Sequence, residues 1–162
     1  MSQTQNKISV SPQGEAFPLP ELSDYAAEYE RVKALAEAAR ESGKEVVVVM
    51  GVGFVGAVMA AIVADCEGKD GQPSKFVIGC QRPSTRSFWK IPLLNRGVSP
   101  VKAEDPQVDL LIGRCVLEKK TLIATYNSQV LDLADCVVID VQCDFLKPEL
   151  GNMKSGECDM AA

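Results

Sequence analysis

The sequence of 162 residues contains no histidine. Without an imidazole the chain has no histidine base and no histidine metal ligand, so Ser-His-Asp and Cys-His catalysis are excluded. Positive charge is not in excess either, because 17 Lys and Arg stand against 22 Asp and Glu, for a formal charge of -5. We therefore expect neither nucleic acid nor an anionic membrane as a partner, since the net charge attracts neither.

Closely spaced cysteine pairs are also missing. The six cysteines are Cys66, Cys80, Cys115, Cys136, Cys143 and Cys158. No two of them form a Cys-x-x-Cys pair, so a zinc site is not expected. Most lie in or beside apolar runs, where a reduced cysteine behaves as a small hydrophobic residue. This pattern predicts a reducing, cytoplasmic location.

One apolar stretch is long enough to span a bilayer. Residues 46–64 are uncharged and mostly apolar, but a β-branched run, a glycine cluster and an Ala-rich run divide them. This division predicts a strand, a turn and a helix instead of a membrane span. The stretch also lies far from the N-terminus, behind an acidic segment, so it is not a signal peptide.

The overall composition is that of a single globular domain. The sequence is 46% hydrophobic and 24% charged, and it is too short for two ordinary domains. Residues 1–20 are polar, rich in proline and without periodicity, which predicts a flexible arm. In residues 21–44, apolar side chains recur at steps of three and four, which predicts a packing helix capped by Ser23 and ended by Gly43.

Strand and helix patterns alternate over residues 45–145. Four apolar runs predict strands, at residues 46–50, 76–80, 122–125 and 136–141. Helical patterns lie between them, at residues 55–66, 87–96, 109–119 and 127–134, and Asn127 can cap the last of these. The alternation predicts an α/β, Rossmann-like three-layer fold with a mostly parallel sheet. With the strands numbered along the chain, their expected order across the sheet is 3-2-1-4.

The C-terminal part predicts an incomplete sheet. Residues from Phe145 onward are polar and predict no further strand, so we interpret 146–162 as a polar tail at a truncation point. The strand at 136–141 would then have a bare apolar edge. We therefore expect either self-association or a missing C-terminal half.

A glycine-rich motif joins the first predicted strand to the following helix. Residues 51–56 read Gly-Val-Gly-Phe-Val-Gly, the pattern G-x-G-x-x-G. Gly51 permits a tight turn, Gly53 lets the backbone approach a pyrophosphate, and Gly56 lets the helix pack on the strand. The free N–H groups at the start of the helix would bind the phosphates. The motif predicts a dinucleotide site, and the alternative is a structural turn without a ligand.

The end of the second predicted strand lacks the acidic residue that usually binds the adenosine ribose. This position reads Cys80-Gln81-Arg82. Gln81 can hydrogen-bond a ribose hydroxyl, while Arg82 together with Arg86 can bind a 2′-phosphate. The expected cofactor is therefore either NAD or NADP. The alternative is that both arginines are ordinary solvated loop residues.

Three stretches within residues 46–144 carry a family resemblance. They are 49–56 (Val-Met-Gly-Val-Gly-Phe-Val-Gly), 93–100 (Leu-Leu-Asn-Arg-Gly-Val-Ser-Pro), and Leu-Ile-Ala-Thr at 122–125 followed by Ala-Asp-Cys-Val-Val-Ile at 134–139. The segment resembles the N-terminal NAD-binding domain of the UDP-glucose/GDP-mannose dehydrogenase family, the nucleotide-sugar dehydrogenases. The second stretch is the most specific, because no general Rossmann rule calls for it.

The resemblance implies an NAD-dependent oxidoreductase. Members oxidise the sugar CH2OH of a UDP- or GDP-sugar to a carboxylate for polysaccharide biosynthesis, through a thioester on a catalytic cysteine. That cysteine and its supporting residues lie in parts of the family beyond this chain, so no catalytic residue is expected here. Two alternatives stay open: a non-catalytic nucleotide-binding or interaction module, and another Rossmann oxidoreductase.

The resemblance also implies a set of cofactor contacts. The set comprises Gly51, Gly53, Gly56, the backbone N–H groups of Phe54 and Val55, Gln81, Arg82 and Cys143. Cys143 stands where the family usually has a threonine that borders the cofactor.

Overall fold

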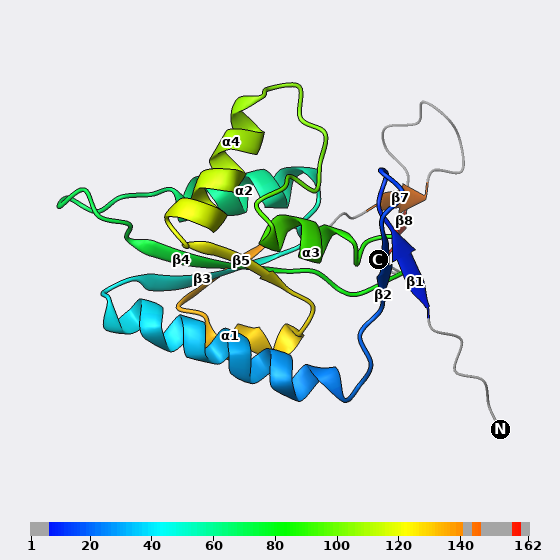
Figure 1. The fold of residues 1–162 in the computed structure, drawn as a ribbon, viewed down its shortest axis with the longest axis horizontal. Helices are drawn as coiled ribbons and strands as arrows, with labels where there is room; N and C mark the ends of the chain where they lie inside the picture. Colours follow the sequence, from blue (N-terminus) through cyan, green and yellow to red (C-terminus); the bar gives the residue numbers. More distant parts are fainter. Residues whose placement is uncertain (1–6, 141–143, 147–156, 160–162) are drawn as a thin grey trace.

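The computed structural model describes residues 7–140, 144–146 and 157–159. Its centre is a four-stranded parallel sheet with helices on both faces (Figure 1). The strands are β3 (Glu45–Met50), β4 (Lys75–Cys80), β5 (Leu122–Thr125) and β6 (Cys136–Ile139). They lie in the order β5-β4-β3-β6, which confirms the α/β Rossmann-like class and the order 3-2-1-4.

The two central strands are buried on both faces. Val46 to Val49 of β3 are at most 4% exposed, and β-branched side chains suit such a pleated, covered position. Val47 and Val49 point into one apolar cluster and Val46 and Val48 into another. The long apolar stretch of residues 46–64 therefore forms a strand, a turn and a helix, as predicted. Within the described residues, no helix combines the length and the hydrophobicity that crossing a membrane requires.

The first face of the sheet carries the helices that connect β3 to β4 and β4 to β5. They are α2 (Phe54–Ala64), α3 (Lys90–Asn95), α4 (Gln107–Gly113) and the π-helical turn η1 (Arg114–Glu118). Four fully buried alanines of α2 allow it to lie close to the sheet. Asp65, just after α2, pairs with Arg114 at 2.6 Å and Lys119 at 3.0 Å, and the Arg114 hydrogen bond lowers the pKa of the carboxyl.

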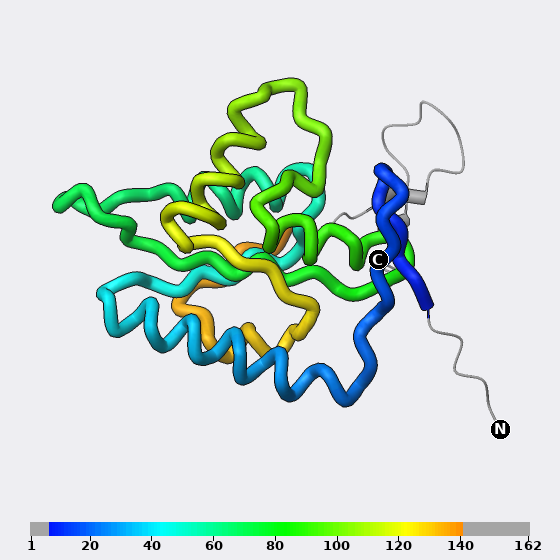
Figure 2. Tube along the Cα trace, viewed as in Figure 1, coloured from blue at the N-terminus to red at the C-terminus, as the bar shows by residue number. Residues whose placement is uncertain are grey.

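The second face is covered by α1 (Asp24–Glu41) and the short 3-10 helix η2 (Ser128–Leu133). Figure 2 traces the chain from β5 through η2 to β6 on the α1 side of the sheet. Because η2 is short, α1 supplies much of the cover, with Val32 and Ala36 fully buried. The predicted packing helix is thus confirmed. Asn127 caps η2 as expected, since its side chain accepts a hydrogen bond from Gln129 N–H at 3.0 Å.

The ends of α1 differ in how well they were predicted. Gly43 has a φ of +78°, which favours glycine, and it follows the end of the helix as expected. At the start, the Ser23 side chain makes no capping hydrogen bond, because its backbone is already helical. Instead, Asp24 accepts a hydrogen bond from Glu21 N–H at 2.8 Å.

The N-terminal arm is not devoid of structure. Strands β1 (Ile8–Val10) and β2 (Ala16–Pro18) form an antiparallel hairpin, so the prediction of a flexible arm over residues 1–20 is wrong for this part. The hairpin lies beyond the carboxyl end of the central sheet (Figure 1). Its stabilising contacts are distant in sequence: Ser9 accepts a hydrogen bond from Trp89 N–H at 3.2 Å, and Glu15 pairs with Arg96 at 2.6 Å.

The C-terminal part holds a second short pair. Strands β7 (Asp144–Leu146) and β8 (Glu157–Asp159) are antiparallel, whereas the sequence predicts no strand in the polar tail. Three-residue strands are too short for an alternating pattern to reveal them.

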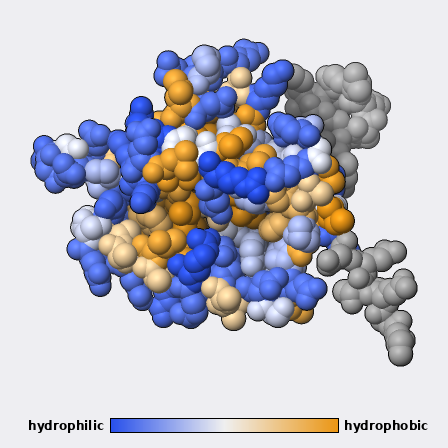
Figure 3. Space-filling model, in the orientation of Figure 1, coloured by the Kyte–Doolittle hydropathy of each residue, from blue (hydrophilic) through white to orange (hydrophobic). Residues whose placement is uncertain are grey.

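The two edges of the central sheet differ in exposure, because Leu122, Ala124 and Thr125 of the edge strand β5 are fully buried, whereas β6 at the other edge is mostly exposed. On β6, Val137 is 43% and Ile139 is 73% exposed, which agrees with the predicted apolar edge. At the opposite edge, β5 borders a groove lined by Leu35, Val116 and Leu117. Figure 3 shows orange apolar residues, crossed by blue hydrophilic ones, over the face of the molecule on which β5 lies in Figure 1.

Candidate nucleotide-binding site

The glycine-rich segment forms a tight turn between β3 and α2, at the carboxyl end of the sheet. Gly51 has a φ of +95°, a conformation that residues with a Cβ atom rarely adopt. Its N–H donates to the carbonyl oxygen of Cys80 at 2.8 Å, which ties the turn to the end of β4. In parallel α/β sheets, this end of the strands is where ligands bind.

The other two glycines have contrasting surroundings. A Cβ atom added at Gly56 would lie 1.9 Å from the carbonyl oxygen of Gly51, so helix and turn approach too closely for any side chain. A Cβ atom added at Gly53 would meet no atom within 4 Å. Gly53 is therefore not needed for packing within the described residues, and the space beside it is open to a ligand.

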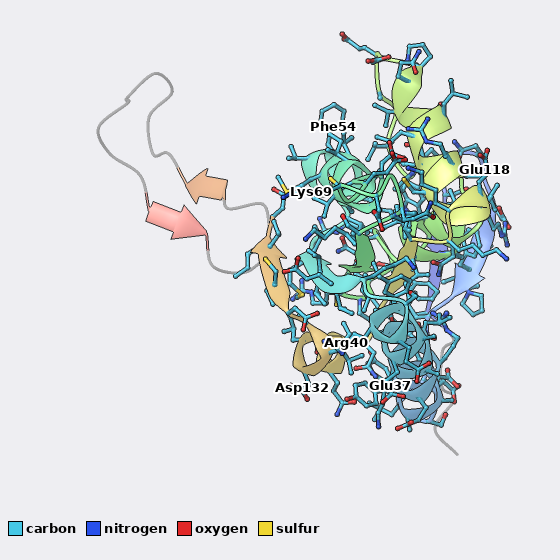
Figure 4. All side chains as sticks on the ribbon, turned by 90° about the vertical axis from the view of Figure 1, so that its left-hand side faces the viewer. Glu37, Arg40, Phe54, Lys69, Glu118 and Asp132 are labelled. Atoms are coloured by element: carbon cyan, nitrogen blue, oxygen red, sulfur yellow. The ribbon has the colours of Figure 1, made fainter. Side chains whose placement is uncertain are left out.

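The start of α2 faces this open space. Gly53 is the N-cap residue, and no side chain makes a capping hydrogen bond at this end of the helix. The N–H groups of Phe54 and Val55 belong to the first turn and have no partner within the helix, so they are available to an anion. The Phe54 side chain is 64% exposed and points away from the sheet (Figure 4). The turn thus fits a pyrophosphate in its backbone geometry.

Gln81 has a partner within the protein that the sequence did not reveal. Its side-chain oxygen accepts a hydrogen bond from Val52 N–H at 3.1 Å, so Gln81 braces the glycine turn from the end of β4. Its side-chain nitrogen donates to the Arg82 carbonyl at 3.5 Å. The predicted contact of Gln81 with a ribose stays a prediction.

The two arginines of the following loop are exposed. Neither Arg82 nor Arg86 forms an ion pair with another described residue. The loop itself is ordered by local bonds, since Ser87 donates to the Arg82 carbonyl at 3.2 Å and the Trp89 indole donates to the Arg86 carbonyl at 2.9 Å. Both guanidinium groups are thus accessible to a phosphate, and their role stays a prediction.

The most specific motif of the sequence, residues 93–100, has a structural role. The Asn95 side chain donates to the Ala124 carbonyl at 2.9 Å and accepts from Ala124 N–H at 2.7 Å. It thereby pairs with the open edge of β5 much as a neighbouring strand would. Gly97 has a φ of +74°, and a Cβ atom there would lie 2.9 Å from Leu117. The motif holds α3 and its following loop against the sheet.

The buried cysteines of the described residues, Cys80 and Cys115, are not reactive groups. Burial raises the pKa of the Cys80 thiol to about 11, and burial likewise raises that of Cys115 to about 11. Both thiols are therefore protonated at neutral pH, unlike a nucleophilic cysteine. Cys143 lies outside the described residues. Within the described residues, no cluster of three or more Cys, Asp or Glu side chains is placed to hold a metal ion.

Asp140 is a site residue that sequence reasoning missed. A Cβ atom added at Gly56 would lie 2.8 Å from the Asp140 carboxylate, which places this acid against the glycine turn. The only signal in the sequence is an acidic residue that directly follows the apolar run of β6.

A comparison with solved structures finds the NDP-N-acetyl-D-galactosaminuronic acid dehydrogenase from Methanosarcina mazei Go1, with a TM-score of 0.57 and 33% sequence identity. The chain is similar to part of a nucleotide-sugar dehydrogenase. The match covers 71% of this chain but only 23% of the other. No protein-family model matches the chain, and no curated protein is a significant match.

This similarity supports, in general terms, the resemblance to nucleotide-sugar dehydrogenases that the sequence motifs indicate. It agrees with a dehydrogenase-like Rossmann fold.

Proposed function

We propose that the turn at residues 51–56 binds the pyrophosphate of NAD or NADP, and that the chain is the cofactor-binding portion of a nucleotide-sugar dehydrogenase. The observation that carries this proposal is the open space beside Gly53, in front of the first turn of α2. Backbone N–H groups and the helix dipole would hold the phosphates there, even though the chain is acidic overall.

The proposed reaction is the oxidation of the sugar CH2OH of a UDP- or GDP-sugar to a carboxylate, in the synthesis of polysaccharide precursors in the cytoplasm. A bound nicotinamide would supply the hydride acceptor. The residues of this chain would bind and orient the cofactor: the turn through its backbone, Gln81 by bracing the turn, and Arg82 by contact with the adenosine half. The catalytic cysteine and the sugar contacts would lie in further chain.

The test is a calorimetric titration of the purified chain with NAD and with NADP. We expect binding that weakens in Gly53→Ala and is lost in Gly53→Val, because their side chains enter the space that the pyrophosphate needs. The Gly53 φ is -77°, so neither variant strains the backbone, and melting curves should show folded proteins. Absence of binding by the unsubstituted chain to either nucleotide would refute the proposal.

The two nucleotides also test the loop arginines. If Arg82 and Arg86 bind a 2′-phosphate, replacing both by alanine should weaken NADP binding and leave NAD binding unchanged. Equal effects on the two nucleotides would contradict that role.

A second candidate is a non-catalytic nucleotide-binding or interaction module. Within this candidate, the Asp140 carboxylate beside the glycine turn favours the interaction module, because it opposes a bound pyrophosphate. Incubation with NAD and UDP- or GDP-sugars does not separate the two candidates for the isolated chain, because we expect no NADH from it in either case. The two candidates can be separated by joining this chain to the proposed catalytic portion. NADH should then form only if this chain is the cofactor-binding portion of the dehydrogenase.

A further inference from the structure

The position of Asp140 follows from the pairing of β6 with β3. Asp140 N–H donates to the Met50 carbonyl at 2.9 Å, so this residue extends the ladder by one step beyond Ile139. Side chains alternate along a strand, and Asp140 therefore shares a face with Val138. Val138 packs against the apolar cluster that includes the alanines of α2. The Asp140 carboxylate is thus directed toward α2.

The carboxylate reaches the junction of the turn and the helix. A Cβ atom added at Gly56 would lie 2.8 Å from Asp140 Oδ2 and 1.9 Å from the Gly51 carbonyl oxygen. Gly56 lies in the first turn of α2, two residues after the helix begins at Phe54. Asp140 is partly buried, so its charge is not fully screened by water.

The carboxylate competes with any anion at the same end of the helix. The N-terminus of a helix carries about half a positive charge, which favours a negative group nearby. Asp140 brings a full negative charge to this first turn, so it both uses that field and repels a second anion. We infer that Asp140 is a specificity-determining residue that lowers the affinity of the glycine turn for pyrophosphate groups. This inference rests on the proposed binding of a dinucleotide.

The test compares the unsubstituted chain with Asp140→Asn, which has nearly the same shape but no charge. Calorimetry would measure the affinities for ADP-ribose, NAD and adenosine. We expect Asp140→Asn to bind ADP-ribose about tenfold more tightly, which corresponds to about 1.4 kcal/mol. NAD should follow in the same direction, while adenosine, which has no phosphate, should be unaffected. Asp140→Ala should also tighten ADP-ribose binding and serves as a second variant.

Asp132→Asn is the matched control, because it removes the same charge from an exposed residue of η2. Figure 4 shows Asp132 on the side of the sheet opposite Phe54. This control should bind all three ligands as the unsubstituted chain does. Both Asp140 variants should stay folded, because the hydrogen bond of residue 140 to Met50 comes from the main chain.

Each result has a distinct meaning. Tighter binding of ADP-ribose by Asp140→Asn than by the unsubstituted chain supports the inference. Equal affinities of the two proteins for ADP-ribose overturn it and leave the proposed function intact. An equal gain for adenosine overturns it as well, since the effect would then be one of packing and not of charge. If no protein binds NAD, NADP or ADP-ribose, the proposed function fails and the inference fails with it.

Discussion

Gly56→Ala should destabilise the fold, because the added methyl group has no space. Its Cβ atom would lie 1.9 Å from the Gly51 carbonyl oxygen, whereas ordinary contacts begin at 3.4 Å. The neighbouring atom is backbone and Gly51 is held by its own hydrogen bond to the Cys80 carbonyl. The start of α2 must therefore move relative to the turn and to the sheet beneath it.

The expected magnitude follows from two opposing effects. Overpacking of a well-packed interior costs about 1–3 kcal/mol. Alanine is a better helix former than glycine by up to about 1 kcal/mol, which offsets part of that cost. We expect a net loss of about 1–2 kcal/mol, which lowers the melting temperature by about 2–8 °C for a chain of this size.

Thermal and urea unfolding followed by circular dichroism would measure this loss. Gly53→Ala is the matched control, since a Cβ atom there meets nothing within 4 Å. Its stability should stay within about 0.5 kcal/mol of the unsubstituted chain, the range of a surface substitution. An unchanged melting temperature for Gly56→Ala, or equal losses for the two variants, would refute the packing argument.

Two further predictions concern the edges of the sheet. Asn95→Ala removes both hydrogen bonds to Ala124 and should cost about 1–3 kcal/mol in urea unfolding, and Asn95→Asp should restore only the bond from the Ala124 N–H. A fully stable Asn95→Ala would show that water replaces these bonds at no cost. The exposed edge of β6 predicts self-association in sedimentation, which Ile139→Lys should reduce because a charge blocks strand pairing. A clean monomer before substitution would contradict that prediction.

Local patterns were sufficient for much of the fold. The valine run of β3, the alanines of α2 and the glycine turn between them are contiguous in sequence, so their periodicity and backbone preferences predict the first strand, turn and helix. The cap at Asn127 is also local, since its partner lies two residues away. The parallel order of the strands followed from the alternation of strands and helices and from the right-handed connections between parallel strands.

Contacts between distant residues decided the rest. The N-terminal hairpin is invisible as a pattern, because residues about 80 positions away, such as Trp89 and Arg96, provide its contacts. Asn95 pairs with the edge of β5, and Gln81 supports the glycine turn. In each case the hydrogen bond joins residues 29 positions apart.

Within the site, Asp140 shows the same difference between what local sequence patterns predict and what contacts between distant residues decide. The sequence by itself determined that a glycine turn follows β3 and that an acid follows β6. Only the pairing of β3 with β6, through parallel strands far apart in the chain, placed that carboxylate against Gly56. No pattern of spacing within one segment can predict this contact, because the carboxylate and the turn come together only when the sheet has formed.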